Sequence, residues 1–209
     1  LEFRRVLFRS LEESIRLFSV TQTVARRYAI NIAAAYNYLG DIEKSQSRLE
    51  TALEMYQKVL DYCDQTELYS SWIVFATNAG MTAFALQQYE LAFTYFQKSY
   101  ELCLQYTISR RRPTIEAYLG LLARIKGDTQ TAVSYLESAQ SHGVVEQHGQ
   151  EVGRVHWAIC FLKTEYPSAE VDQAFSKSLA TYGTIALQQL DGYGDVWERT
   201  YLEQLLQAE

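Results

Sequence analysis

The chain has 209 residues, of which 48% are hydrophobic and 21% are charged, and its formal net charge is −6. This apolar content excludes a disordered chain, and the acidic balance argues against direct nucleic-acid binding, which needs a surplus of Lys and Arg on one face. The three cysteines match no disulfide framework and no zinc-binding spacing, and no apolar run approaches the ~20 residues of a membrane-spanning helix. We therefore expect a cytoplasmic protein that does not enter a membrane.

The first ten residues, LEFRRVLFRS, differ in composition from the rest of the chain and resemble vector-derived sequence. A second interpretation is that residues 1–10 form the charged, amphipathic end of a preceding helix. We expect residues 11–209 to form the folded domain, as a fragment of a larger protein.

The remaining sequence predicts an all-α fold. Only two prolines occur, Pro113 and Pro167, and long stretches rich in Ala, Leu, Gln, Glu and Tyr favour helix. No strand-length run alternates β-branched with polar residues. In chain order, the predicted helices cover residues 11–21, 24–39, 42–62, 66–87, 89–106, 113–126, 129–141, 147–165, 168–189 and 195–207.

One pattern recurs four times after the first predicted helix: an apolar helix, a short turn, and a second helix with small and large residues at fixed spacing. The four turns are placed at Gly40-Asp41, Gln87-Gln88, Gly127-Asp128 and Tyr166-Pro167. The first small residues of the second helices are then Ser45, Ala92, Ala132 and Val171. The number of residues between successive positions is largest from Ser45 to Ala92, and it is nearly the same for the other two intervals.

The third copy, with Leu119-Gly120 followed by Ala132, Leu136 and Ala139, resembles the tetratricopeptide repeat. This resemblance implies a right-handed α-solenoid of about four helix pairs, closed by a C-terminal capping helix over residues 195–207. Small residues are expected where paired helices approach most closely, with Ala132 facing Gly120. All three intervals exceed the family's usual repeat of about 34 residues. The lengthened repeats resemble the C-terminal repeat regions of large bacterial signal-transduction ATPases and ATP-dependent transcription regulators.

In the tetratricopeptide repeat family, the first helices of the pairs line a concave groove. Transferred to this chain, the resemblance implies a groove lined by Arg27, Asn37, Tyr38, Thr77, Asn78, Met81, Phe84, Tyr118, Arg124, His156 and Lys163. The alternative is that several of these residues, Phe84 among them, belong to the core. The Lys and Asn clamp with which chaperone-binding members hold a carboxylate is missing, because Ile30 and Ala34 stand at its first positions.

No catalytic constellation, nucleotide-binding loop or cofactor motif is recognisable, so we expect neither an enzyme nor a cofactor site. His156 and Cys160 are four residues apart and could offer two metal ligands, but no third ligand has a convincing spacing, and we expect a packed helix face instead. The cluster Arg110-Arg111-Arg112 could hold an anion. We expect instead a solvated loop, because Pro113 marks the first turn of a helix.

The resemblance implies a protein- or peptide-binding scaffold segment of a larger bacterial regulator, monomeric or weakly self-associating. One alternative is a domain of a transcription regulator, cyclase or kinase that senses a ligand or a signalling peptide. A second alternative is the accessory helical region of a truncated enzyme.

Overall fold

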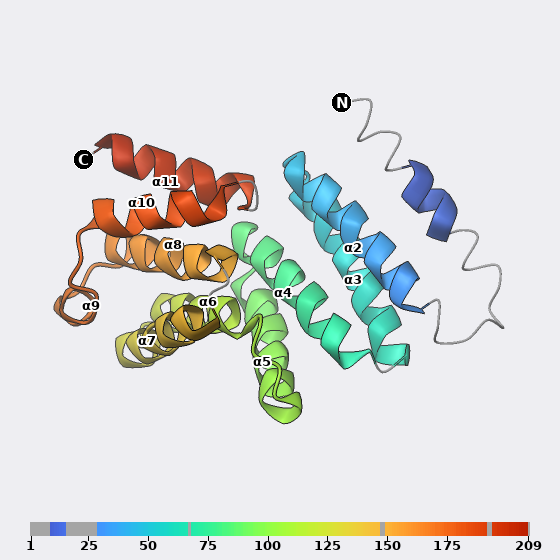
Figure 1. Ribbon diagram of the computed structural model, residues 1–209, viewed down its shortest axis with the longest axis horizontal. Helices are drawn as coiled ribbons and strands as arrows, with labels where there is room; N and C mark the ends of the chain where they lie inside the picture. Colours follow the sequence, from blue (N-terminus) through green and yellow to red (C-terminus); the bar gives the residue numbers. More distant parts are fainter. Residues whose placement is uncertain (1–8, 16–28, 67, 147–148, 192–193, 209) are drawn as a thin grey trace. The chain divides into compact units, whose positions relative to one another are not determined.

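The structure is a computed structural model that describes residues 9–15, 29–66, 68–146, 149–191 and 194–208. These residues form helices and connecting turns, and no strand occurs among them, which confirms the all-α helical-repeat fold. Residues 9–15 form a short helix. It is followed by α2 (Ala29–Ser45), α3 (Leu49–Thr66), α4 (Tyr69–Ala85), α5 (Tyr89–Tyr106), α6 (Arg112–Ile125), α7 (Thr129–Glu146), α8 (Gly149–Glu165), α9 (Ala169–Ala174), α10 (Leu179–Leu190) and α11 (Val196–Ala208) (Figure 1).

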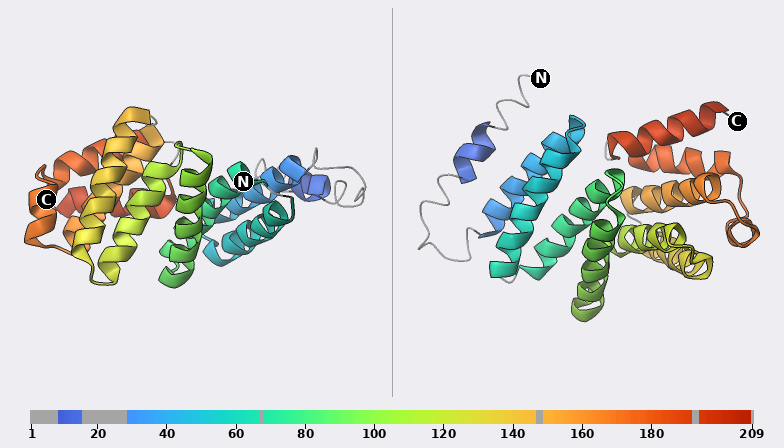
Figure 2. Two further views of the ribbon diagram at one scale, coloured as in Figure 1. Left: turned by 90° about the horizontal axis from the view of Figure 1, so that it is seen from below. Right: turned by 180° about the vertical axis from the view of Figure 1, so that it is seen from behind.

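The predicted repeat domain is organised as two compact units, Leu1–Tyr95 and Phe96–Glu209, with the boundary inside α5. In the first unit α2 packs against α3, and α3 packs against α4 (Figures 1 and 2). In the second unit α6 packs against α7 and α8, and α8 packs against α10. No described helix is long and apolar enough to cross a membrane.

Three turns join the paired helices with the same backbone conformation. Ser47, Gln87 and Gly127 have positive φ angles of 59°, 59° and 91°. In each turn the next residue donates its amide to the carbonyl five positions earlier, as Asp128 does to Ala123 at 3.0 Å. This is the Schellman arrangement that ends a helix. Because the three positions are equally spaced along the chain, the repeat has a constant length over these turns.

The predicted position of the first turn was wrong. Gly40 and Asp41 lie inside α2, which continues to Ser45, and the turn follows at residues 46–48. A Cβ on Gly40 would lie 2.5 Å from a ring carbon of Tyr56 on α3, so the glycine serves a close helix contact and does not end a helix. The first small residue of the second helix is therefore Ala52 and not Ser45. The number of residues from Ala52 to Ala92 then equals the number from Ala92 to Ala132.

The predicted helix over residues 168–189 was also wrong, because the chain breaks between α9 and α10. Ser168 and Ser178 cap the two helices by accepting amide hydrogen bonds from Val171 and Thr181 at 3.3 and 3.2 Å. From α8, the Lys163 ammonium donates to the carbonyl of Phe175 at 2.7 Å within the break. The partner of α8 is therefore α10.

The core of the second unit contains a column of aromatic rings. The ring of Phe96 stacks on that of Tyr118, with 5.0 Å between the ring centres. The Tyr118 ring stacks in turn on Trp157, with 5.7 Å between the centres. Trp157 meets Trp197 of α11 edge to face at 4.8 Å. The predicted capping helix is thus α11, which packs against α10 and α8.

Candidate functional site

Two of the predicted groove residues meet in the first unit. The Asn78 side chain, from α4, donates a hydrogen bond of 2.9 Å to Oδ1 of Asn37, from α2. Nδ2 of Asn37 in turn donates to Asp41 at 3.1 Å. Asn37 and Asn78 are 8% and 7% exposed, whereas Tyr38, beside Asn37 in the chain, is 57% exposed. A hydrogen bond between two asparagine side chains therefore links α2 to α4, the first helices of successive pairs.

This amide pair belongs to a longer row of polar side chains, Asn37, Asp41, Lys44 and Asn78, which are linked by hydrogen bonds and one ion pair and which we name the polar row. Tyr56 donates to Oδ1 of Asp41 at 2.5 Å, and the Lys44 ammonium lies 3.8 Å from the same oxygen. The sequence interpretation missed Asp41 and Lys44 because it ended the first helix at residue 39 and placed a turn at Gly40-Asp41. Their spacing from Asn37, four and seven residues, is the signal that places all three on one helix face.

Four other predicted groove residues lie in the interior. Thr77, Met81, Phe84 and Tyr118 are 0%, 1%, 4% and 0% exposed. Thr77 donates to the carbonyl of Ile73 at 2.7 Å, and Tyr118 donates to Glu198 of α11 at 3.0 Å. The core interpretation therefore holds for these side chains. Arg27 lies outside the described residues.

The predicted cationic groove residues are engaged within the fold. The Arg124 guanidinium lies 5.6 Å from the centre of the Tyr166 ring, a cation–π contact. Lys163 hydrogen-bonds the break between α9 and α10 and also pairs with Asp172 at 3.0 Å. Both side chains stabilise loops in the second unit.

The arginine cluster is not the solvated loop that the sequence predicted. The Arg111 guanidinium pairs at 3.0 Å with Glu151 of α8, which is 3% exposed and also accepts a hydrogen bond from Thr114. Arg112 pairs at 2.9 Å with the buried Glu116. Only Arg110 of the three is exposed. The local sequence could not show this, because the carboxylate of Glu151 belongs to a helix far along the chain.

A second buried charge pair links α8 to α11. The Arg154 guanidinium donates to Glu198 at 3.2 Å, and the other carboxylate oxygen accepts the backbone amide of Asp195 at 3.0 Å. Burial raises the pKa of Glu198, and the adjacent guanidinium opposes that shift. With Tyr118 as a further donor, this carboxylate fixes the first turn of α11 in the interior.

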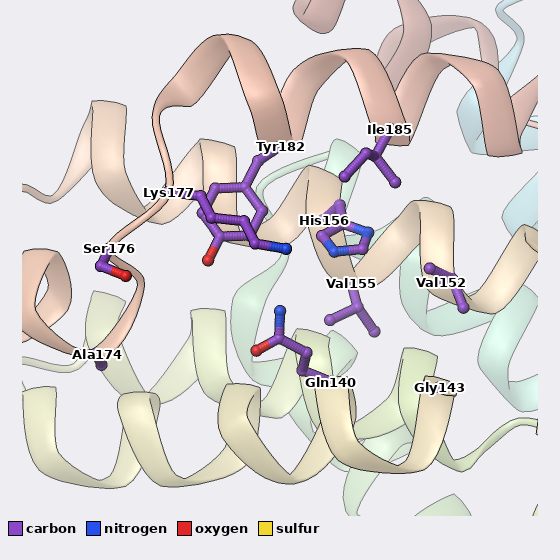
Figure 3. A pocket seen from close by; sticks show the side chains of 10 residues that line it. All are labelled: Gln140, Gly143, Val152, Val155, His156, Ala174, Ser176, Lys177, Tyr182 and Ile185. Atoms are coloured by element: carbon purple, nitrogen blue, oxygen red, sulfur yellow. The ribbon is translucent and has the colours of Figure 1, made fainter. Parts of the chain in front are cut away.

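A pocket of about 470 Å³ opens between α7, α8 and α10 (Figure 3). Its lining consists of Gln140, Gly143, Val152, Val155, His156, Ala174, Ser176, Lys177, Tyr182 and Ile185. Burial lowers the pKa of His156, the Lys177 ammonium lowers it further, and the nearby Val152 carbonyl opposes both effects. Cys160, the predicted neighbour of His156, directs Sγ toward the carbonyl of Leu179 at 3.9 Å.

Comparison with known proteins supports the architecture. Residues 75–106, which cover much of α4 and all of α5, match the tetratricopeptide repeat family. No curated protein matches the sequence. The fold is similar to the crystal structure of BtubC (BKLC) from P. vanneervenii, with a TM-score of 0.63 and 13% identity over 98% of this chain and 88% of that chain. The chain is therefore an all-α helical-repeat protein in which one segment, residues 75–106, matches the tetratricopeptide repeat.

Proposed function

We propose that the chain is a protein-interaction module that binds an extended peptide segment of a partner along α2 and α4. Tetratricopeptide repeats generally mediate contacts between proteins, and residues 75–106 match that family. The observation that carries the proposal is the polar row beside the exposed ring of Tyr38.

The chemistry of the row suits a peptide backbone. Each asparagine amide offers two donors and one acceptor oxygen with two lone pairs, so a pair that holds two helices together can also hydrogen-bond an extended chain. Tyr38 supplies a large ring with a polar tip, a residue type that contributes strongly to protein interfaces. Ile30, which is 53% exposed, lies eight residues earlier on the same face of α2.

Selection from a displayed random-peptide library tests this proposal, followed by fluorescence anisotropy on the selected peptide. Replacing Tyr38→Ala should weaken binding by about tenfold or more, because an anchoring ring is lost. Tyr106→Ala is the matched control, since Tyr106 is also exposed but lies at the end of α5. Failure to enrich any sequence, or equal affinity for the Tyr38→Ala variant, would refute peptide binding at this face.

The proposal also concerns the larger protein to which this module belongs. We infer that the module serves a larger cytoplasmic regulator, on the strength of the lengthened repeat alone. A second candidate function, the sensing of a small molecule, is favoured by the pocket that His156 and Lys177 line.

A further inference from the structure

The pocket of the second unit is lined by both polar and aliphatic side chains. Gln140 comes from α7, His156 from α8, and Lys177 from the break between α9 and α10. Figure 3 shows these three side chains directed toward a common space. The aliphatic side chains of Val152, Val155 and Ile185 complete this lining, and Figure 3 shows them around His156.

The imidazole of His156 is one of the polar groups that line the pocket. The residue is 8% exposed, and its Nδ1 is buried without a hydrogen bond that meets the usual limits of distance and angle. Buried polar atoms are ordinarily satisfied, because an unsatisfied one loses its contact with water without replacement. The carbonyl of Val152, one turn earlier on α8, also acts on this imidazole, so the cavity with its polar lining, and not the ring alone, indicates a ligand site.

The charge around the cavity favours an anion. Lys177 carries the only formal charge among the ten described lining residues, and none of the ten is acidic. Lys177 is exposed, so its ammonium can reach a ligand at the mouth of the pocket. The aliphatic wall and a volume in the range of small-molecule sites favour an organic anion over a bare inorganic one.

We propose that this pocket binds a small organic monocarboxylate. The carboxylate lies between the Lys177 ammonium and the Gln140 amide, both of which can donate hydrogen bonds to it. The hydrocarbon part packs against Val152, Val155 and Ile185, and His156 supplies a hydrogen bond beside the carboxylate. This inference rests on the second candidate function and is independent of peptide binding at the polar row.

The test is a titration of the full chain with 3-methylbutanoate, followed by the histidine Hε1 signals in NMR spectra. The chain contains three histidines, so a His156→Gln variant identifies the signal of interest. We expect this signal to shift to saturation, and the dissociation constant to rise about tenfold or more in Lys177→Met, because a charge-assisted hydrogen bond is lost. Lys58→Met, at an exposed lysine of α3, should bind as the wild type does.

Two further ligands complete the experiment. The neutral 3-methylbutanamide has the same shape without the charge and should bind far more weakly, and inorganic phosphate should cause no saturable shift. The proposal is overturned by the absence of a saturable shift up to about 100 mM, by an equal response to the amide, or by an unchanged dissociation constant in Lys177→Met. A response to phosphate alone would also overturn the assignment of an organic acid.

Discussion

A Cβ atom on Gly120 would lie 3.0 Å from the carbonyl oxygen of Ala132 on the neighbouring helix. It would also lie 3.1 Å from Cγ of Leu136, so the backbones of α6 and α7 approach as closely as the glycine allows. Ala132 and Leu136 are both fully buried. This contact confirms the predicted register of the third pair.

Enlarging the small residue at this contact should destabilise the chain. We expect Ala132→Leu to reduce the free energy of unfolding by ~1–3 kcal/mol, because added volume strains a close-packed interior. Leu136→Ala should cost ~2–5 kcal/mol through the cavity that it leaves. Urea unfolding followed by circular dichroism measures both changes. A neutral Ala132→Leu would contradict the register of this helix pair.

The sequence predicted the turn of the third helix pair correctly but placed the turn of the first helix pair too early in the chain. Gly40-Asp41 and Gly127-Asp128 are the same dipeptide, yet only Gly127 has a positive φ and only Asp128 caps a helix, by accepting the Thr131 amide at 3.0 Å. The first dipeptide is inside α2 because Tyr56 packs over Gly40. A local motif therefore cannot distinguish a helix end from a close helix contact.

The arginine before α6 should contribute to stability, contrary to the sequence prediction. Arg111→Ala leaves the carboxylate of Glu151 buried without its cation, and we expect a loss of ~1–3 kcal/mol. Arg110→Ala is the control, because Arg110 is exposed. Chemical denaturation of the two variants should separate them clearly. Equal stabilities would show that the ion pair contributes nothing.

The pair between Arg154 and Glu198 should be essential for docking α11. Glu198→Ala removes the acceptor for Arg154 and Tyr118, and we expect a loss of ~3–5 kcal/mol, as for other broken buried pairs. Adding Arg154→Met to this variant should restore part of the stability, because no uncompensated cation then remains. Proteolysis of α11 in the single variant, monitored by mass spectrometry, checks the local effect. An α11 that stays protected in Glu198→Ala would contradict this role.

The His156 imidazole should make stability depend on pH near neutrality. Its pKa in the folded chain is below the ordinary value of about 6.5, so the unfolded chain takes up a proton first as the pH falls. Stability is therefore fully retained above the unfolded pKa and declines as the pH drops through it. His156→Gln should show a smaller decline over this range in urea midpoints. Identical pH profiles would contradict a depressed pKa.

Much of the candidate site could not be predicted from the sequence, because it depends on contacts between helices that are far apart in the chain. Family offsets selected Asn37 and Asn78, which the structure has on α2 and α4, the first helices of successive pairs. They could not show that Tyr118 is covered by α11, whose Glu198 is 80 residues away. Nor could they show the pocket, whose lining includes Ser176 and Lys177 from the break between α9 and α10. Contacts between distant helices decide which side chains remain accessible.

Hydrogen–deuterium exchange of the chain with and without a selected peptide tests the central claim most directly. Peptide binding along α2 and α4 predicts slower exchange in residues 29–45 and 69–85, and this protection should be reduced in the Tyr38→Ala variant at the same peptide concentration. Protection confined to helices of the second unit, or no change in exchange at saturating peptide, would contradict the proposed binding face.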